Sequence, residues 1–476
     1  MIVTVKSEDY SSDFFVAFFT KCLTKQIKNV AAALIVINFK EAKVLKNLTP
    51  KILKSYLSYS IEKLLDHKEI YLNDPEKAFS RTKKISFHDA MLFPMVTSGE
   101  STSIEMLDYF PKTDIPSQAA MIYRRDQIKV RAFHDLFIDF TSRIPKKKTF
   151  HGMHLIACDG TRLDTPYNPL DTESFVHCIE GRKGFNQYHL ITCHDVLNDV
   201  YVDATIQGYF SMNEKLAFCE MMDRFPSDGS YLFVTDRGFS SYNVIAHALN
   251  NGHHFVMRLT SSMAKNVFCD NKEPINEEPF DLEDDIHVGR IRTRKSRSLS
   301  NYHFLRYNSR YDYIPDGSEK IDKFHVRLVM FELPGGTMEY LLTDLPKDQL
   351  TLSDLQEIYR LRWDIETSFR HLKYASGLKH IHSLKRTFIF QEIYAKLLCY
   401  NFCAAVYKML NGSIQTQKKH LYVPDKTYMF KCCLRFLKNK LNKIEQIVQN
   451  KKAPVRAGRK FERIIRRQHV DALQYR

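Results

Sequence analysis

The sequence predicts an α/β fold in which a mixed β-sheet is flanked by helices. Between residues 151 and 259, apolar strand-like runs and helical patterns follow one another in the order β-β-β-α-β-α-β. A mainly helical region precedes this stretch, and a strongly basic segment ends the chain. The predicted strands are His154–Cys158, Tyr188–Cys193, Val200–Ile206, Tyr231–Thr235 and His254–Leu259, and the predicted helices are Asn213–Phe225 and Ser240–Asn250.

Residues 1–150 show apolar and charged positions at helical spacing, most clearly through Asp126–Arg143. Pro145 and three lysines then end the pattern. We expect a mainly helical N-terminal region that forms a separate module.

Residues 260–350 differ from both neighbouring regions. An acidic patch over residues 277–285 is followed by a basic patch over 290–297, and strand-like runs appear at Lys323–Leu333 and Met338–Leu342. This texture predicts a β-rich insertion. Residues 351–412 then hold two predicted helices, Ser353–Tyr374 and roughly 386–409, before the basic segment 413–476.

Most of the net charge lies in that last segment. The chain carries +15 overall, and residues 413–476 hold 17 Lys and Arg against 4 Asp and Glu, a net +13. Clustered cationic side chains are typical of proteins that neutralise phosphates, which indicates a polyanion partner. A basic face without a partner stays open, whereas an acidic membrane is a weaker candidate because Pro424, Pro454 and Gly458 interrupt any long amphipathic helix.

The composition predicts a cytoplasmic protein. Hydrophobic residues make up 44% of the chain, yet the longest apolar runs, Phe14–Phe19 and Val30–Ile37, are far shorter than the roughly 20 residues of a membrane-spanning helix. Acidic residues stand where a signal peptide would be basic. The ten cysteines lack repeated C-x-x-C spacing, so we expect buried reduced thiols and no structural zinc.

Two aspartates follow predicted strands. Asp159 comes directly after His154–Cys158 and precedes a glycine, and Asp236 comes directly after Tyr231–Thr235. Taken singly, each is explained by ordinary turn chemistry. Together they place two carboxylates at strand ends.

The predicted helix Ser353–Tyr374 carries a polar stripe. At about 100° per residue, Arg362, Glu366 and Lys373 all fall within about 60° of Tyr359. Apolar residues occupy the adjacent face, so Glu366 is expected on a packed helix. An amphipathic surface helix with i,i+4 ion pairs explains the charges alone, but it does not explain the aligned tyrosine and lysine.

This spacing, Y-x2-R-x3-E-x6-K, resembles the signature of the DDE insertion-sequence transposases of the Y-R-E-K group, the IS-four family that includes the Tn-five transposase. The resemblance runs from about residue 80 to the C-terminus. Asp159 in Ala-Cys-Asp-Gly-Thr matches the first acid, Asp236 in Val-Thr-Asp-Arg-Gly-Phe the second, and Glu366 the third. The helix segments near Gln391 and the basic residues after Pro454 also look like the family.

The resemblance implies an RNase H-like catalytic fold over residues 151–259 and 351–412, interrupted by the β-rich insertion 260–350. It also implies that Asp159, Asp236 and Glu366 hold two Mg²⁺ or Mn²⁺ ions, hard cations that suit carboxylate oxygens and phosphates. Tyr359, Arg362 and Lys373 would then contact the scissile strand through its phosphates. Arg370 is a further candidate on the same helix.

Trp363 is the only tryptophan of the chain. It stands near the polar stripe, where stacking on a DNA base competes with ordinary packing as an explanation. Some relatives use a tryptophan of the insertion to stack on a flipped base. This insertion has none, so Tyr302 or Phe304 would have to serve, or the hairpin step is absent.

The sequence thus predicts a transposase that cuts double-stranded DNA at the inverted-repeat ends of its element and joins them to target DNA. The resemblance implies a homodimer on DNA, in the cytoplasm of a prokaryote and associated with the nucleoid, with no membrane partner. Residues 1–150 are predicted to bind the ends, and residues 413–476 to bind DNA or to dimerise. Two alternatives stay open, a structure-selective nuclease of the same fold and a non-catalytic DNA-binding protein derived from a transposase.

Overall fold

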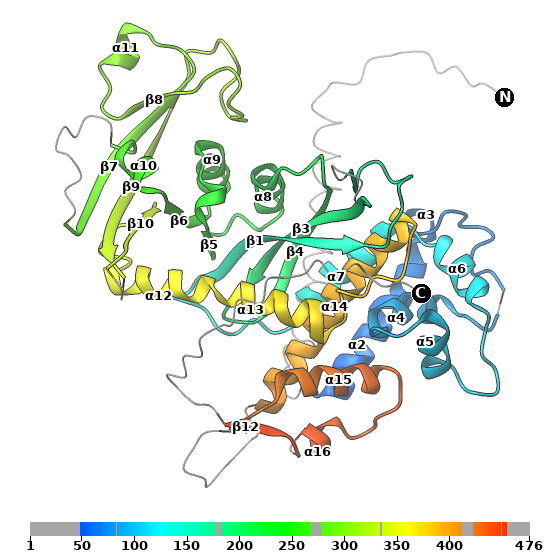
Figure 1. The fold of residues 1–476 in the computed structure, drawn as a ribbon. Coiled ribbons are helices and arrows are strands. Elements are labelled where there is room, and N and C mark those ends of the chain that lie inside the picture. The colour runs from blue at the N-terminus through cyan, green and yellow to red at the C-terminus, as the bar shows by residue number, and fades with distance from the viewer. Residues whose placement is uncertain are drawn as a thin grey trace, which may run out of the picture. The chain divides into compact units, whose positions relative to one another are not determined.

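A single ten-stranded sheet runs through the computed structural model, which describes residues 48–81, 83–177, 183–268, 278–333, 336–411, 422–448 and 450–454. The strand order is β2-β3-β1-β5-β6-β10-β9-β7-β8, with β4 paired to β3 (Figure 1). Pairing is parallel for β1 with β5, β5 with β6, and β7 with β8, and antiparallel elsewhere in the sheet. The predicted mixed sheet flanked by helices is confirmed.

The central part of the sheet follows the predicted order of elements, with one short extra strand. Its strands are β1 (His154–Thr165), β2 (Phe175–Val176), β3 (Phe185–Asp195), β4 (Val200–Gly208), β5 (Tyr231–Thr235) and β6 (His254–Leu259). The helices between them are α8 (Glu214–Met222) and α9 (Tyr242–Asn250), with the 3-10 turn η3 (Arg237–Phe239).

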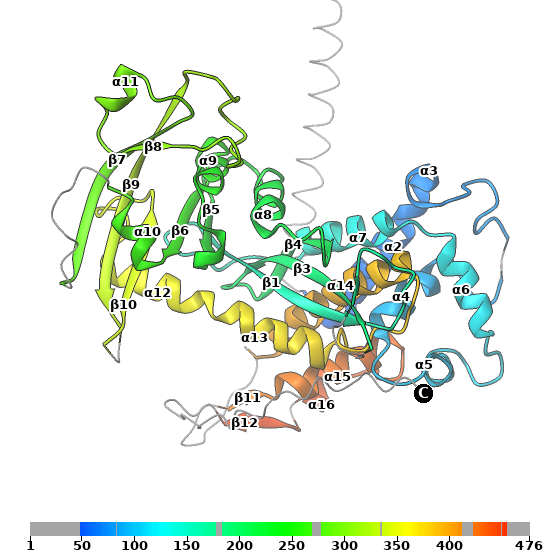
Figure 2. The same ribbon diagram turned by 45° about the horizontal axis from the view of Figure 1, so that its top comes forward.

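Helices cover both faces of this part of the sheet (Figures 1 and 2). On one face, α8 and α9 bury an apolar core against alternate residues of the strands, including Ile156 and Cys158 of β1 and Phe233 of β5. The long helix α14 (Arg386–Asn411) packs on the other face through β4, as does α7 (Val130–Ser142). Buried cysteines such as Cys193 are free thiols.

Residues 260–350 extend the same sheet. Strand β10 pairs with β6 and with β9, and β9 pairs with β7. These strands therefore extend the sheet beyond β6, which would otherwise be its edge strand. Their elements are α10 (Ser261–Lys265), β7 (Phe280–Gly289), α11 (Arg294–Arg297), β8 (Tyr302–Phe304), β9 (Ile321–Glu332) and β10 (Met338–Thr343).

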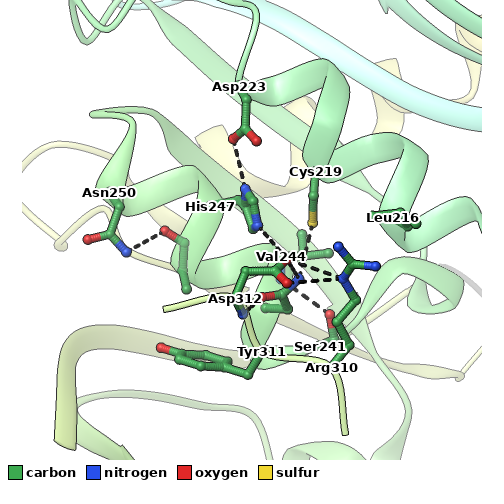
Figure 3. Close-up of polar contacts among 12 residues, drawn as sticks. Leu216, Cys219, Asp223, Ser241, Val244, His247, Asn250, Arg310, Tyr311 and Asp312 are labelled. Atoms are coloured by element: carbon green, nitrogen blue, oxygen red, sulfur yellow. Dashed lines mark hydrogen bonds and ion pairs between the residues drawn. The ribbon is translucent and has the colours of Figure 1, made fainter. Parts of the chain in front are cut away.

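The loop between β8 and β9 is fastened to the helices of the central part. His247 of α9 lies between two carboxylates, with Nδ1 2.7 Å from Asp223 and Nε2 3.1 Å from Asp312 (Figure 3). Asn243 donates to Asp312 at 2.9 Å and accepts from its backbone N–H. From within the same region, Arg290 donates to backbone carbonyls of the loop. Arg290, which belongs to the predicted basic patch, therefore stabilises the loop within the protein.

The chain outside the sheet is helical. Before the sheet lie α2 (Pro50–Lys63), η2 (Leu64–His67), α3 (Lys68–Tyr71), α4 (Phe87–Val96), α5 (Thr102–Tyr109) and α6 (Gln118–Asp126) in addition to α7. After β10 come α12 (Leu352–Arg362), α13 (Asp364–Arg370), the π-helical turn η4 (His371–Ala375), α14, α15 (Lys426–Leu437) and α16 (Ile444–Val448). The short strands β11 (Tyr422–Pro424) and β12 (Lys452–Pro454) form a separate pair.

The described part of the basic segment packs against the core. Lys426 of α15 lies 2.7 Å from Asp199, and Lys438 contacts Glu105 at 3.2 Å. These lysines are therefore engaged within the protein. The predicted DNA contacts of residues 455–476 lie outside the described residues. No helix within the described stretches has the length and apolar character needed to span a bilayer.

Candidate active site

The register of two parallel strands brings Asp159 and Asp236 together. The parallel pairing of β1 with β5 ends at Cys158 and Thr235. Asp159 and Asp236 are the residues that follow this last pair. The sequence predicted Asp159 at the end of its strand, but the structure places it within β1. Strand β1 continues to Thr165 because β3 keeps pairing with it beyond the end of β5. Asp159 instead lies where β1 loses its parallel neighbour.

Alternation along β1 decides which face Asp159 occupies. Cys158 points into the core formed with α8 and α9, and successive side chains of a strand point to opposite faces. Asp159 therefore faces the side where α13 contacts β1 and α12 contacts β5. Figures 1 and 2 show α12 and α13 running along this side of the sheet. Helix α13, which carries Glu366, thus lies against the strand of Asp159, and α12 lies against the strand that precedes Asp236.

That helix is not the single regular helix predicted over Ser353–Tyr374. Helix α12 ends at Arg362, Trp363 separates it from α13, and α13 passes into the π turn η4. The Trp363 N–H bonds to the carbonyl of Arg360, three residues back, which tightens the chain at the junction. A π turn contains an extra residue, so the uniform rotation used to place Lys373 on the stripe does not hold.

Arg362 connects two of the three predicted acids. Its Nη1 lies 4.0 Å from Oδ2 of Asp159, and its Nη2 lies 3.4 Å from Oε1 of Glu366. The arginine side chain is only 3% exposed, whereas that of Glu366 is 46% exposed. The structure therefore brings Glu366 and Asp159 to one guanidinium, which is buried between them.

A second arginine, Arg258 of β6, stands beside the remaining acid. Its Nη1 lies 3.6 Å from Oδ1 of Asp236. Its other nitrogens bind Glu339 of β10, through an Nη2 bond of 3.0 Å and a close contact from Nε. Sequence reasoning missed both residues, and the available signal was a charged residue within each of two apolar strand runs.

Glu339 is a buried carboxylate, with only 3% of its side chain exposed. Burial raises its pKa, and the neighbouring Arg258 opposes that effect while Asp236 adds to it. The group is thus a fourth carboxylate at the edge of the site.

Tyr359 lies between the two arginines. The centre of its ring is 5.8 Å from the guanidinium carbon of Arg258 and 5.4 Å from that of Arg362. Burial raises the pKa of Tyr359 to about 12, although both arginines favour its ionised form. The tyrosine stays protonated, and its ring lies close to both guanidinium groups.

Asp159 is held in an environment that disfavours its charge. Burial raises its pKa to about 6, and the carboxylates of Glu366 and Glu214 add to the effect. The backbone N–H of Gly160, 2.8 Å away, and Arg362 oppose it. A cation entering between these carboxylates would relieve their repulsion.

The other predicted contact residues lie apart from the acids. Lys373 donates to the carbonyl of Arg162 at 3.0 Å, and burial lowers its pKa. Arg370 is exposed on α13. Trp363 is 52% exposed, with the Arg362 guanidinium 5.1 Å from its ring centre, so its ring is available to a partner rather than packed in the core.

The donors at the site suit a hard cation. They are carboxylate oxygens, and Oδ1 of Asp236 is a buried atom that accepts no hydrogen bond. The hydroxyl of Tyr359 and Nε of Arg362 are likewise buried without a hydrogen-bond partner, a situation that usually marks groups completed by water, an ion or a ligand. Within the described part of the chain, no three His, Cys, Asp or Glu side chains are already gathered at metal-binding distance. The arginines hold the carboxylates in their present positions.

Gly160 belongs to the site for steric reasons. A Cβ at this position would overlap both the His189 ring and the Glu214 carboxylate, which bond to each other at 2.7 Å. A side chain at residue 160 would therefore displace His189 or Glu214, which lie next to the first acid on the opposite face of β1.

Comparison with known proteins gives the family. A profile described as "Transposase DDE domain" matches residues 150–402, more than half of the chain. This range contains all three predicted acids and both arginines. The comparison with curated proteins gave no match.

Among solved structures, the chain is similar to the piggyBac transposase in a cryo-EM synaptic complex with hairpin DNA. The identity is 9%, 84% of each chain is covered, and the TM-score is 0.43. This likeness is too distant to assign a site or a partner, so the profile match carries the assignment. The chain belongs to the transposase DDE domain family.

Proposed function

We propose that this protein cuts DNA at the ends of a mobile element and joins those ends to target DNA, with Asp159, Asp236 and Glu366 as its catalytic carboxylates. The observation that carries the proposal is the pairwise proximity of these acids. The β1–β5 register makes the two aspartates neighbours, and Arg362 contacts both Asp159 and Glu366.

The carboxylates would hold divalent Mg²⁺ or Mn²⁺, two ions by analogy with this chemistry in general. Bound there, such ions supply charge stabilisation for the attacking and leaving oxygens of a phosphodiester. The protein's own contribution is to place the carboxylates on rigid elements. Two of them stand at adjacent strand positions, and the third stands on a helix packed across the same face.

Arginine rearrangement is part of the proposal. Arg362 and Arg258 neutralise the carboxylates before ions and DNA are present, and the guanidinium of Arg362, once released, can make a bidentate contact with a phosphate. Tyr359 keeps the two cations apart, and the exposed Trp363 and Arg370 face the partner. Lys373 would add a phosphate contact once its bond to the Arg162 carbonyl is released.

We assign the protein to the Y-R-E-K group on the spacing of Tyr359, Arg362, Glu366 and Lys373. Within that assignment, residues 151–259 and 351–412 form an RNase H-like catalytic core, and residues 260–350 form the insertion. Residues 1–150 and 413–476 would bind DNA ends, and a homodimer would pair two ends.

The direct test is cleavage of cognate end DNA by purified full-length protein. With Mg²⁺ the protein should nick DNA carrying the inverted repeats that border its gene. Asp236→Asn should remove nicking by at least about a thousandfold while thermal stability and metal-free DNA binding stay close to those of the parent protein. Asp228→Asn, an exposed aspartate before β5, is the matched control and should cut normally. Cutting by the Asp236 variant at the parent rate would refute the assignment.

A further inference from the structure

Glu339 and Arg258 form a charge pair that the DDE signature does not contain. Arg258 lies in β6 and Glu339 in β10, two antiparallel strands in which Arg258 is directly opposite Leu341. Glu339 is two residues from Leu341, so it occupies the diagonal position on the same face. The geometry of the sheet, rather than chain flexibility, brings the two side chains together.

The contact fixes three sides of the guanidinium. Nε and Nη2 bind the two oxygens of Glu339, Nη1 points to Asp236, and the flat face lies over Tyr359. Two-point binding of a planar guanidinium restricts its orientation as well as its position. Without Glu339, only the 3.6 Å contact to Asp236 and the tyrosine ring would orient Arg258.

Charge balance gives the pair a second consequence. An isolated arginine next to Asp236 would repel any cation that the carboxylates attract. Glu339 is nearly fully buried, so its charge is poorly screened by water and offsets that of Arg258 at short range. The pair as a whole presents Asp236 with an oriented donor and little net charge.

We propose that Glu339 is a positioning residue of the DNA-cutting site, which fixes Arg258 beside Asp236 and neutralises its charge. This inference rests on the proposed function, because it assigns Asp236 to the metal-holding carboxylates. Glu339 itself contacts neither Asp159 nor Glu366. In this assignment it does not contact the reacting phosphate either.

Titration of full-length protein with Mn²⁺ alone, without DNA, followed by the EPR signal of the free ion, tests the neutralising role. Glu339→Gln keeps the shape but leaves the arginine charge unbalanced, and it should raise the Mn²⁺ dissociation constant about tenfold. The double variant Arg258→Met with Glu339→Gln removes both charges and should bind Mn²⁺ within about twofold of the parent. Equal Mn²⁺ binding by Glu339→Gln and the parent would overturn the proposal, as would failure of the double variant to recover.

A shorter carboxylate tests the positioning role. Glu339→Asp retains the charge but cannot reach both guanidinium nitrogens. Its Mn²⁺ affinity should stay within about twofold of the parent, whereas the nicking rate at saturating DNA should fall about tenfold because Arg258 is displaced. Nicking at the parent rate would overturn the proposal, and this variant carries the test if Glu339→Gln fails to fold.

A remote ion pair controls for loss of stability. Arg327 of β9 is 2% exposed and binds Asp281 of β7 at 2.8 Å, in the same sheet but away from the acids. Asp281→Asn should lower the melting temperature and leave Mn²⁺ affinity unchanged. A parent protein that neither binds Mn²⁺ nor cuts DNA would refute the proposed function itself. A parent that does both, with an unaffected Glu339→Gln, refutes only this inference.

Discussion

Each acid of the candidate site lies beside an arginine, and this pairing shapes its chemistry. Arg362 contacts Asp159 and Glu366, and Arg258 contacts Asp236. Burial raises the pKa of Asp159 to about 6, and repulsion from the nearby carboxylates of Glu366 and Glu214 adds to that effect. The arginines reduce that repulsion while no divalent ion is present. The crowding of these residues therefore makes the candidate site costly to ionise.

Asp159 should therefore destabilise the metal-free protein at neutral and alkaline pH. Its folded-state pKa lies above the unfolded value of about 3.9, so the folded state binds the proton more tightly and stability falls as pH rises through about 4 to 6. Asp159→Asn carries no charge at any pH. As the pH rises from 4.5 to 8, the free energy of unfolding of the variant should increase relative to that of the parent by about 1–2 kcal/mol, a value reduced for partial exposure.

Urea unfolding in the presence of EDTA at several pH values measures this difference. Asp228→Asn, whose carboxylate is exposed, is again the control for a lost surface charge. A stability difference between Asp159→Asn and the parent that does not change with pH would contradict the account.

The sequence placed Asp159, Asp236 and Glu366 on the correct elements because strand and helix patterns are local signals. It could not place Arg258 or Glu339, since their meeting depends on which strands pair and in what register. It left stacking on a base and ordinary packing open for Trp363, because a periodicity argument contains no information about what covers a helix face. The half-exposed ring reflects the break between α12 and α13.

At the scale of elements, the loop between β8 and β9 shows how the β-rich region is attached to the central helices. Asp312 accepts hydrogen bonds from Asn243 and contacts His247, which is also bound to Asp223 (Figure 3). Two polar contacts to one carboxylate, made where the groups are partly buried, are worth more than an exposed ion pair. The region that follows the second acid is therefore fixed to α9 by a small number of identifiable bonds.

Asp312→Ala should release this loop without unfolding the sheet. Removing the carboxylate leaves Asn243 and His247 with fewer partners, at a cost of about 1–3 kcal/mol. Hydrogen exchange measured by mass spectrometry should accelerate in residues 305–316 and remain unchanged in β1 and β5.

Asp316→Ala is the matched control for this prediction. Asp316 pairs with Arg290 at 3.0 Å but is 73% exposed, so its removal should have little effect. Equal exchange in the loop of Asp312→Ala and the parent would show that the contacts to α9 do not hold it.

Element boundaries were less predictable than element types. The central order β-β-β-α-β-α-β was correct because each segment combines a clear period with flanking turn residues. The length of β1 was underestimated, since its second half pairs only with β3 and lacks the continuous apolar character of a buried strand. The π turn η4 was missed because no local residue pattern predicts such a turn.

For the molecule as a whole, α14 connects the catalytic elements to the helices that precede them in the chain. Glu392 forms a buried ion pair with Arg125 at 3.1 Å, and Asn401 bonds to Thr141 and to the backbone of Tyr201. The helices before β1 thus share a core with the sheet and its third acid. Sequence analysis assigned them a role in end binding but contained no signal for this shared core, which rests on contacts more than 200 residues apart.

The same long-range packing supports the central claim that three acids from distant parts of the chain form one catalytic site. Their elements are held by the sheet register on one side and by α12, α13 and α14 on the other. Under the proposed function, ion binding would require only side-chain movement, chiefly release of Glu366 and Asp159 by Arg362.

A crystal structure of the full-length protein soaked with Mn²⁺, with the ions located by anomalous scattering, tests this claim most directly. We expect manganese at about 2.1–2.3 Å from oxygens of Asp159 and Asp236, with Glu366 turned away from Arg362 to complete the ligand set. Manganese absent from these carboxylates at saturating concentration, or bound there with Glu366 still on Arg362 and out of reach, would contradict the account.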